Sequence, residues 1–553
     1  MTKDPSVLLH RAKEIAWRIP EGQKRALLLR GVAQTFAHGA FFAEAQVTLM
    51  EIAEPHHREG AFLQVGLEIF ATQGEEGVAS LLTSAPPTAR AHLLARIGTK
   101  RARSGKRGEG KKAFDEALAT VAGVISPRQR SLLAADIVAR MAGCGLLEEG
   151  RRAARRIEAP HPRCRAWSVV AGMLLREGRK ADAMAAVASA RSAANEIPHA
   201  ALADAARIRI VEILAAQGEW TQAQAVAETL HAPLPRSEAL GAIGEAAARS
   251  GALAEPFFAE ALSTARSIDF ERQRSEALLG LATRYTRIGA GTVADEIARA
   301  AAAGITRIED PRWQRKMWHR LGGIALRRVL EGKEKEPFSL AEEIADATVR
   351  CEVLCRIVRQ VWTMPSLRER TLEAVEQSLD RITDPPLRIE ALCRLAEAMQ
   401  LDDPDQATPP LKRATEAVST LSDPEVRGRA LSRIGGVWAQ RRLNPGEALR
   451  SFSEAERAIS QISSPYWQMR PLKRLIETMI ACGFLEEATH LAETRAQGPT
   501  RHRLERCIAL AYFRRGEETR ALGIAEDIDD PAERAMALTR MARAACDKMP
   551  FGR

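Results

Sequence analysis

Residues 160–198 read PHPRCRAWSVVAGMLLREGRKADAMAAVASARSAANEIP. Apolar residues recur three and four positions apart on both sides of Gly178, which is the pattern of two amphipathic helices. Glycine readily adopts the left-handed conformation that ends a helix, and a proline lies at each end of the segment. The segment therefore predicts a helical hairpin whose two helices join at Gly178.

The same hairpin pattern recurs along the chain. Fifteen junctions start a new apolar helix at a mean spacing of about 36 residues; they lie at Pro20, Pro55, Pro87, Pro127, Pro160, Pro198, Pro235, Phe270, Pro311, Ala347, Pro385, Pro424, Pro465, Pro499 and Pro531. Most junctions are followed by a glycine, at Gly39, Gly74, Gly105, Gly145, Gly178, Gly218, Gly251, Gly289, Gly483 and Gly516. A lone hairpin cannot bury its apolar stripe, so successive hairpins must stack. We predict an all-α fold, a right-handed α-α superhelix (solenoid) of about 14 two-helix repeats.

Some repeats depart from this pattern and suggest where the solenoid divides. Residues 331–337, 363–370, 401–410 and 441–447 carry prolines and charges in place of the glycine turn. Variation in surface loops would produce the same departures. We predict an N-terminal solenoid over residues 1–330 and an irregular C-terminal solenoid over residues 331–553, continuous with the first.

The junctions have a characteristic chemistry. Aspartate precedes proline at Asp310, Asp384, Asp423 and Asp530, where its side chain can cap the helix that starts at the proline. An arginine follows three residues later at Arg58, Arg90, Arg130, Arg163, Arg388, Arg427 and Arg534. A cation in the first turn opposes the helix dipole. These arginines therefore either bond the end of the preceding helix or form a ladder for an anionic partner.

The basic charge of the chain is concentrated in residues 1–166, which hold 26 Lys plus Arg against 17 Asp plus Glu. Two clusters stand out, namely Lys100, Arg101, Arg103, Lys106, Arg107, Lys111 and Lys112, followed by Arg151, Arg152, Arg155 and Arg156. They are either a polyanion-binding patch or a solvated surface. The run GKRGEGKK over residues 105–112 approaches a phosphate-binding loop, but Lys112 replaces the required Ser or Thr and no strand precedes it.

Several functional classes lack support in the sequence. No apolar stretch is long enough for a membrane span, and residues 1–20 do not read as a secretory signal, so we expect a soluble, cytoplasmic protein. Cys351 and Cys355 share a helix face and Cys393 could lie nearby, yet zinc would need a fourth ligand. No arrangement of histidine, cysteine, serine and carboxylate nominates a catalytic site. We therefore expect no enzyme, no metal and no cofactor.

The repeat resembles the tetratricopeptide repeat family in spacing more than in identity. The closest unit carries the family's helix and turn positions at Trp167, Val170, Ala171, Leu174, Gly178, Ala183, Val187 and Ala190. The next carries them at Ile210, Val211, Leu214, Gly218, Ala223, Ala227, Leu230 and Pro235. The resemblance implies an interaction scaffold that binds peptides or partner domains on the surface lined by the first helices.

These observations predict a scaffold or adaptor that binds a partner protein or peptide along a solenoid groove. One alternative is a nucleic-acid-binding repeat protein that uses the basic N-terminal third. A second alternative is the regulatory subunit of an enzyme complex. The partner, the pathway and the oligomeric state are not encoded in any motif of the chain.

Overall fold

The computed structural model describes residues 4–331, 338–399, 404–440 and 444–548, and all regular structure in these residues is helical. The predicted all-α fold class is confirmed. Two kinds of helix alternate along the chain; the first helix of each repeat is called an A helix and the second a B helix. No helix within the described ranges combines the length and apolar character that crossing a membrane requires. The helices form two compact units, Met1–Ile97 with Thr408–Arg553 (unit 1) and Gly98–Ala407 (unit 2), and α5 (Pro87–Arg103) spans their boundary.

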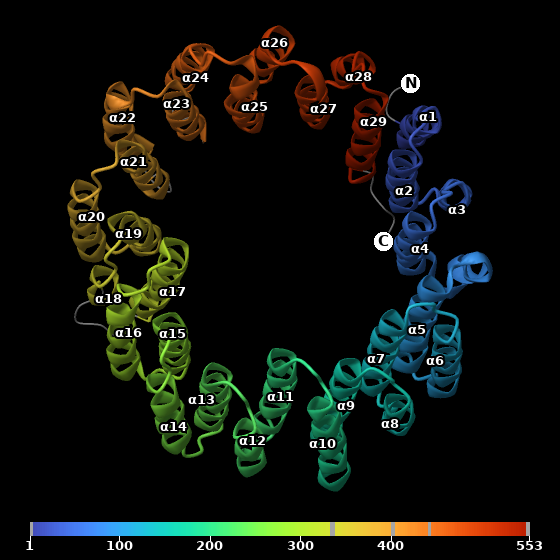
Figure 1. The fold of residues 1–553 in the computed structure, drawn as a ribbon. Helices are drawn as coiled ribbons and strands as arrows, with labels where there is room; N and C mark the ends of the chain where they lie inside the picture. The colour runs from blue at the N-terminus through green and yellow to red at the C-terminus, as the bar shows by residue number, and fades with distance from the viewer. Residues whose placement is uncertain (1–3, 332–337, 400–403, 441–443, 549–553) are drawn as a thin grey trace. The chain divides into compact units, whose positions relative to one another are not determined.

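Unit 2 contains eight A helices among its described residues: α7 (Pro127–Gly143), α9 (Pro160–Arg176), α11 (Ala200–Ala215), α13 (Pro233–Arg249), α15 (Glu271–Arg287), α17 (Pro311–Leu330), α19 (Ala347–Val361) and α21 (Pro385–Met399). Its B helices are α6 (Arg107–Val121), α8 (Leu147–Arg155), α10 (Lys180–Asn195), α12 (Trp220–Ala227), α14 (Glu255–Arg266), α16 (Gly291–Ile305), the short α18 (Ser339–Glu342) and α20 (Pro365–Asp380), followed by the 3-10 turn η1 (Pro404–Ala407). From α7 to α21 each A helix packs on the next, so the A helices form one layer and the B helices the other (Figure 1).

Unit 1 has the same two layers. Its A helices are α2 (Gly22–His38), α4 (Pro55–Ser84), α23 (Pro424–Ala439), α25 (Pro465–Cys482), α27 (Gly498–Arg515) and α29 (Pro531–Cys546). Its B helices are α1 (Pro5–Trp17), α3 (Phe42–Met50), α22 (Thr408–Ala417) with the 3-10 turn η2 (Val418–Thr420), α24 (Pro445–Ser460), α26 (Leu485–Arg495) and α28 (Glu518–Glu526). Helix α4 contains a kink at Gly74, whose φ of 74° is left-handed.

The last A helix, α29, pairs with the first helix of the chain. Helix α1 packs along α29 as a B helix packs on its A helix, while α29 also packs on α2 as one A helix on the next (Figure 1). Arg11 of α1 reaches Glu526 of α28 at 2.5 Å, and His38 of α2 reaches Asp547 at 2.8 Å. One repeat of unit 1 is therefore built from two segments at opposite ends of the sequence.

The junction arginines bond the end of the preceding helix. Arg58 donates to the Ile52 carbonyl at 2.6 Å, and Arg534 to the Ile528 carbonyl at 2.8 Å. The same bond, from an arginine to a carbonyl six residues earlier, occurs at Arg130, Arg163, Arg236, Arg274, Arg350 and Arg427. Arg388 instead reaches the Asp380 carboxylate at 3.4 Å. These bonds satisfy orphan carbonyls at helix ends, which accounts for a cation at a position that opposes the helix dipole.

The predicted aspartate caps are also present. Asp310, Asp423 and Asp530 each accept a hydrogen bond from a backbone N–H in the first turn of their helix. The junction expected at Pro235 is shifted, because α13 begins at Pro233 with Ala232 as its N-cap. Either proline suits the first turn, where the missing N–H is not needed.

One predicted turn glycine has a different role. Gly39 has a φ of −81°, and the left-handed residue is Ala40 with a φ of 64°. A Cβ atom at Gly39 would lie 2.7 Å from the Cys546 sulfur, so glycine is needed there for space. The other nine predicted turn glycines do have positive φ.

Replacing Ala40 with glycine should therefore stabilise unit 1 by about 1 kcal/mol, because the left-handed conformation strains an L-residue but not glycine. The measurement is the midpoint of thermal unfolding. Gly105→Ala is the matched control, since Gly105 has a φ of 88° and open space around its Cβ direction. It should lower the midpoint, and a rise in both variants would contradict this account.

The expected division near residue 330 stays a prediction, and residues 332–337 of that segment lie outside the described residues. Residues 401–403 and 441–443 of the other irregular segments also lie outside the described residues.

The apolar core follows the predicted pattern in the described repeats. Trp167, Val170, Ala171 and Leu174 of α9 are buried against the neighbouring helices.

Candidate functional site

The solvent-facing surface of the A-helix layer carries a repeated charge pattern. Counting from zero at the first residue of each A helix, positions 5 and 9 lie one turn apart on the same helix face. Position 5 is glutamate in four A helices of unit 2, at Glu238, Glu276, Glu352 and Glu390. Position 9 is arginine in several A helices, including Arg320, Arg356, Arg394, Arg433 and Arg474.

These positions pair between adjacent A helices in unit 2. Arg320 at position 9 of α17 bonds Glu276 at position 5 of α15, with 2.8 Å between nitrogen and oxygen. Arg394 of α21 bonds Glu352 of α19 in the same register, at 2.7 Å. The A-helix surface of unit 2 is thus crossed by ion pairs that hold one carboxylate against an arginine of the next repeat.

Burial, together with the neighbouring Glu276 carboxylate, raises the pKa of Glu238 on this surface. Arg284 and Arg320 lie near enough to oppose the shift. The effect of Glu276 on Glu238 is expected where position 5 repeats the same charge in adjacent helices. In α13 and α15 the acids at position 5 therefore bring two negative charges close together. The positive charge of Arg320, at position 9 of α17, partly offsets them.

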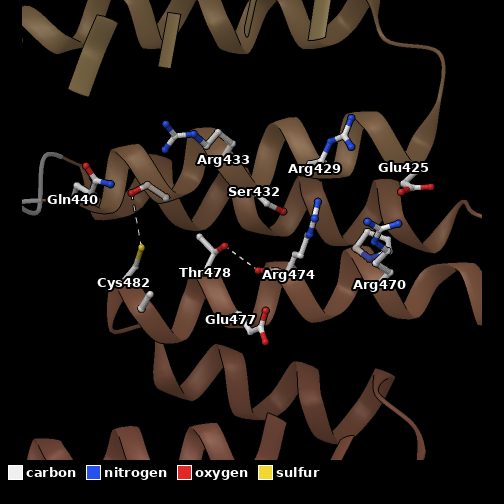
Figure 2. A pocket seen from close by; sticks show the side chains of 13 residues that line it. Glu425, Arg429, Ser432, Arg433, Gln440, Arg470, Arg474, Glu477, Thr478 and Cys482 are labelled. Carbon is white, nitrogen blue, oxygen red and sulfur yellow. Dashed lines mark hydrogen bonds between the residues drawn. The ribbon is translucent and has the colours of Figure 1, made fainter. Parts of the chain in front are cut away.

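Unit 1 breaks the pattern at α23 and α25. Position 5 is Arg429 in α23 and Arg470 in α25, in place of the glutamate found in four A helices of unit 2. Position 9 remains arginine, at Arg433 and Arg474. Figure 2 shows these four arginines along the two neighbouring helices. We call them the arginine site.

The arginine site lines a cavity of about 480 Å³ between α23 and α25. Small residues leave room for the cavity: a Cβ atom at Gly436 would approach Thr478 at 3.0 Å. Glu425 and Glu477 also line it, which leaves a surplus of two positive charges among the ionised side chains. Most of the side chains that line the cavity are charged or polar, which suits it to a charged ligand.

The thiol of Cys482 also lines the cavity (Figure 2), where its sulfur lies 3.8 Å from the Gly436 carbonyl oxygen. Burial raises the pKa of this thiol, so it is protonated at neutral pH. A protonated thiol is a weak nucleophile. The arrangement is suited to binding an anion through guanidinium groups, and no described group in it is activated for covalent chemistry.

A second cavity of about 480 Å³ lies in unit 2 between α9 and α11. Arg165 and Arg209 line it together with His161, Cys164 and the exposed Ala205. Arg165 is paired with Asp136 of α7, so this cavity holds fewer unpaired cations than the arginine site. It shows that A-helix grooves also open to solvent in unit 2.

The basic residues predicted in the N-terminal third lie at the end of α5, at the turn that follows it, and on the B helices α6 and α8. Lys100, Arg101 and Arg103 end α5, Lys106 and Arg107 start α6, Lys111 and Lys112 lie within α6, and Arg151, Arg152, Arg155 and Arg156 lie on or at the end of α8. Three of them, Lys111, Arg152 and Arg156, line one cavity of about 550 Å³ together with Asp115, Glu149 and Glu158. The remaining eight residues do not line that cavity. Polyanion binding by these clusters stays a prediction.

Backbone conformation and packing account for two of the three glycines of the GKRGEGKK run, Gly105 and Gly110. Gly105 is the left-handed turn residue, with a φ of 88°. A Cβ atom at Gly110 would lie 2.9 Å from Ala102 and from the Gly98 carbonyl oxygen, so Gly110 allows α6 to approach the end of α5. The run is a turn followed by a helix, which is not the strand, loop and helix of a phosphate-binding loop.

The buried cysteines Cys351, Cys355 and Cys393 form no disulfide within the residues that the structure describes. Across the described residues, no three histidine, cysteine, aspartate or glutamate side chains gather as a metal site would require. Sequence reasoning missed the arginine site. Its signal is arginine at both position 5 and position 9 of two successive A helices, which becomes visible only when the repeats are aligned on the first residue of each A helix.

The sequence matches no protein-family model and no curated protein. The solved structures that this chain matches include Ton1535 from Thermococcus onnurineus NA1, at 18% identity over 67% of this chain and 97% of that one, with a TM-score of 0.25. Yeast Tom70 matches at 15% identity over 82% of this chain and 95% of its own, with a TM-score of 0.25. The TPR domain of P58(IPK) matches at 14% identity over 72% of this chain and 98% of its own, with a TM-score of 0.20.

These likenesses concern helical architecture alone. The class of the protein follows from its own packing, in which A and B helices alternate and adjacent A helices stack into a layer. It is an all-α repeat protein with divergent tetratricopeptide-like hairpins.

Proposed function

We propose that this chain is a non-catalytic scaffold that binds a partner protein along the surface of its A-helix layer. The observation that carries the proposal is a solvent-open groove between adjacent A helices in each unit, between α9 and α11 in unit 2 and between α23 and α25 in unit 1. Stacked helical hairpins provide an extended surface of this kind for binding. The charged side chains of positions 5 and 9 supply polar contacts beside small apolar residues.

Site-specific photocrosslinking tests this proposal. A photoreactive amino acid at Ala205, on the A-helix surface, should crosslink to a partner protein in native lysate. The same amino acid at Ala188, an exposed alanine of the B helix α10, is the matched control and should crosslink much less. Equal crosslinking at both positions would contradict a binding surface on the A layer.

Nuclease treatment separates this proposal from the nucleic-acid alternative. Protein crosslinks at Ala205 should persist after the lysate is treated with nuclease. Crosslinks that disappear after this treatment, together with steep weakening of binding by salt, would instead favour nucleic acid as the partner.

A further inference from the structure

The arginine site lacks the acids that pair with equivalent arginines elsewhere. In unit 2, position 9 of one A helix bonds position 5 of the preceding A helix, as Arg320 bonds Glu276. In the same register Arg474 of α25 would face position 5 of α23, which is Arg429. Arginine therefore stands where the two ion-paired registers of unit 2 provide a carboxylate, at Glu276 and Glu352.

Three of the four arginines have no partner among the residues that the structure describes. No hydrogen bond or ion pair forms there at the guanidinium groups of Arg429, Arg470 or Arg474. Like charges that share one groove repel each other, and an anion between them removes that repulsion. The site is therefore arranged for an anionic group that the chain does not itself supply.

The number of arginines indicates the charge of that group. In the ion pairs of unit 2, one arginine suffices to hold one carboxylate from the adjacent helix, as Arg394 holds Glu352. Three unpaired arginines offer more donors than one carboxylate can accept. A phosphoryl dianion has three strong acceptor oxygens and close to two negative charges, which matches both the donors and the surplus charge of the cavity.

The glutamates of the cavity limit how much negative charge can enter. Glu425 and Glu477 line it together with the arginines. A nucleic acid carries a charge at every nucleotide and would place further phosphates near these carboxylates. A single dianion in an otherwise neutral segment avoids that repulsion, so the lining favours a phosphorylated peptide over a nucleic-acid strand.

We propose that the arginine site binds a phosphorylated side chain in a segment of a partner protein. This inference rests on the proposed scaffold function and gives it a specific ligand. Arg429, Arg470 and Arg474 hold the phosphoryl oxygens, and the small residues Ser432, Gly436 and Ala481 leave space for the peptide backbone. Binding at this site would therefore depend on phosphorylation of the partner.

Calorimetric titration with N-acetyl-phosphoserine amide tests the site without any requirement for a flanking sequence. The full chain should bind this probe saturably, and at least roughly tenfold more tightly than N-acetyl-serine amide or N-acetyl-glutamate amide. Inorganic phosphate should compete. No saturable binding, or equal binding of the three amides, would overturn the proposal, and stronger competition by oligouridylate would favour a nucleic-acid ligand instead.

Two variants locate the binding and one controls for charge. Arg474→Ala and Arg429→Glu should each weaken binding by about tenfold or more. Arg429→Glu places at position 5 the acid found in four A helices of unit 2, so it should pair with Arg474 and leave the thermal midpoint unchanged or higher. Arg450→Ala, on the exposed face of the B helix α24, removes the same charge and should bind as the parent chain does.

Wild-type affinity in both arginine-site variants would place the binding elsewhere and refute the site. The two proposals fail separately. Protein crosslinks at Ala205 without phosphoserine binding would support the scaffold function and contradict the phosphoserine ligand. Phosphoserine binding that depends on Arg474, without crosslinks at Ala205, would support the arginine site and contradict the proposed protein-binding surface.

Discussion

Replacing Leu9 with alanine is expected to remove hydrogen-exchange protection from α29 as well as from α1. Leu9 is fully buried in α1, and truncating a buried leucine costs about 2–5 kcal/mol. Because α1 supplies the B helix of the repeat to which α29 belongs, the apolar face of α29 loses its cover when α1 detaches. Amide exchange of residues 5–17 and 531–546, followed by mass spectrometry, measures both helices.

Val7→Ala is the matched control, since Val7 is 55% exposed in the same helix and should have little effect on either segment. Protection of α9 and α10 in unit 2 should be unchanged in both variants. If Leu9→Ala increased exchange in α1 alone, the two helices would not form one cooperative repeat.

Replacing Arg328 with alanine should destabilise the hairpin of α16 and the adjoining α17 by about 3–5 kcal/mol. Arg328 is 4% exposed and forms a two-pronged ion pair with Asp295, at 3.0 and 3.2 Å. Its removal leaves the Asp295 carboxylate buried without that partner. Breaking a buried ion pair by removing one partner is strongly destabilising, because the remaining charge is no longer compensated. Loss of amide protection in residues 291–330 measures the effect locally, which matters because long repeat arrays do not unfold in two states.

The double variant Arg328→Ala with Asp295→Ala tests the cause. It should be less destabilised than the sum of the two single variants, because neither charge is then left without the other. Additive effects would mean that packing of the arginine side chain, and not its charge, stabilises this contact. Gly291→Ala provides a further check, since a Cβ atom there would lie 2.0 Å from the Arg328 guanidinium.

Much of the fold could be predicted because its signals are local. A proline or an aspartate cap acts within one helical turn, and a glycine such as Gly178 acts at a single residue. The junction arginines stand out for a local reason as well, because a cation in the first turn opposes the helix dipole. The structure settles their role by showing bonds such as that from Arg534 to the Ile528 carbonyl.

The features that sequence reasoning missed depend on distant or alternative contacts. Gly39 matches the spacing of a turn glycine, yet its lack of a side chain serves the contact with Cys546, more than 500 residues away in sequence. Helix α1 lies before the first junction, and only α29 shows that it is a B helix. The arginine site requires the register between adjacent A helices, which repeat spacing alone does not provide.

The pairing of α1 with α29 has a consequence for biosynthesis. Helix α1 emerges from the ribosome while residues 18–530 and then α29 are still to be translated. Leu8 and Leu9 are buried in the complete chain, and α1 packs most extensively on α29, so α1 cannot reach this packing until α29 has been synthesised. The final packing of α1 thus follows synthesis of the chain through residue 546.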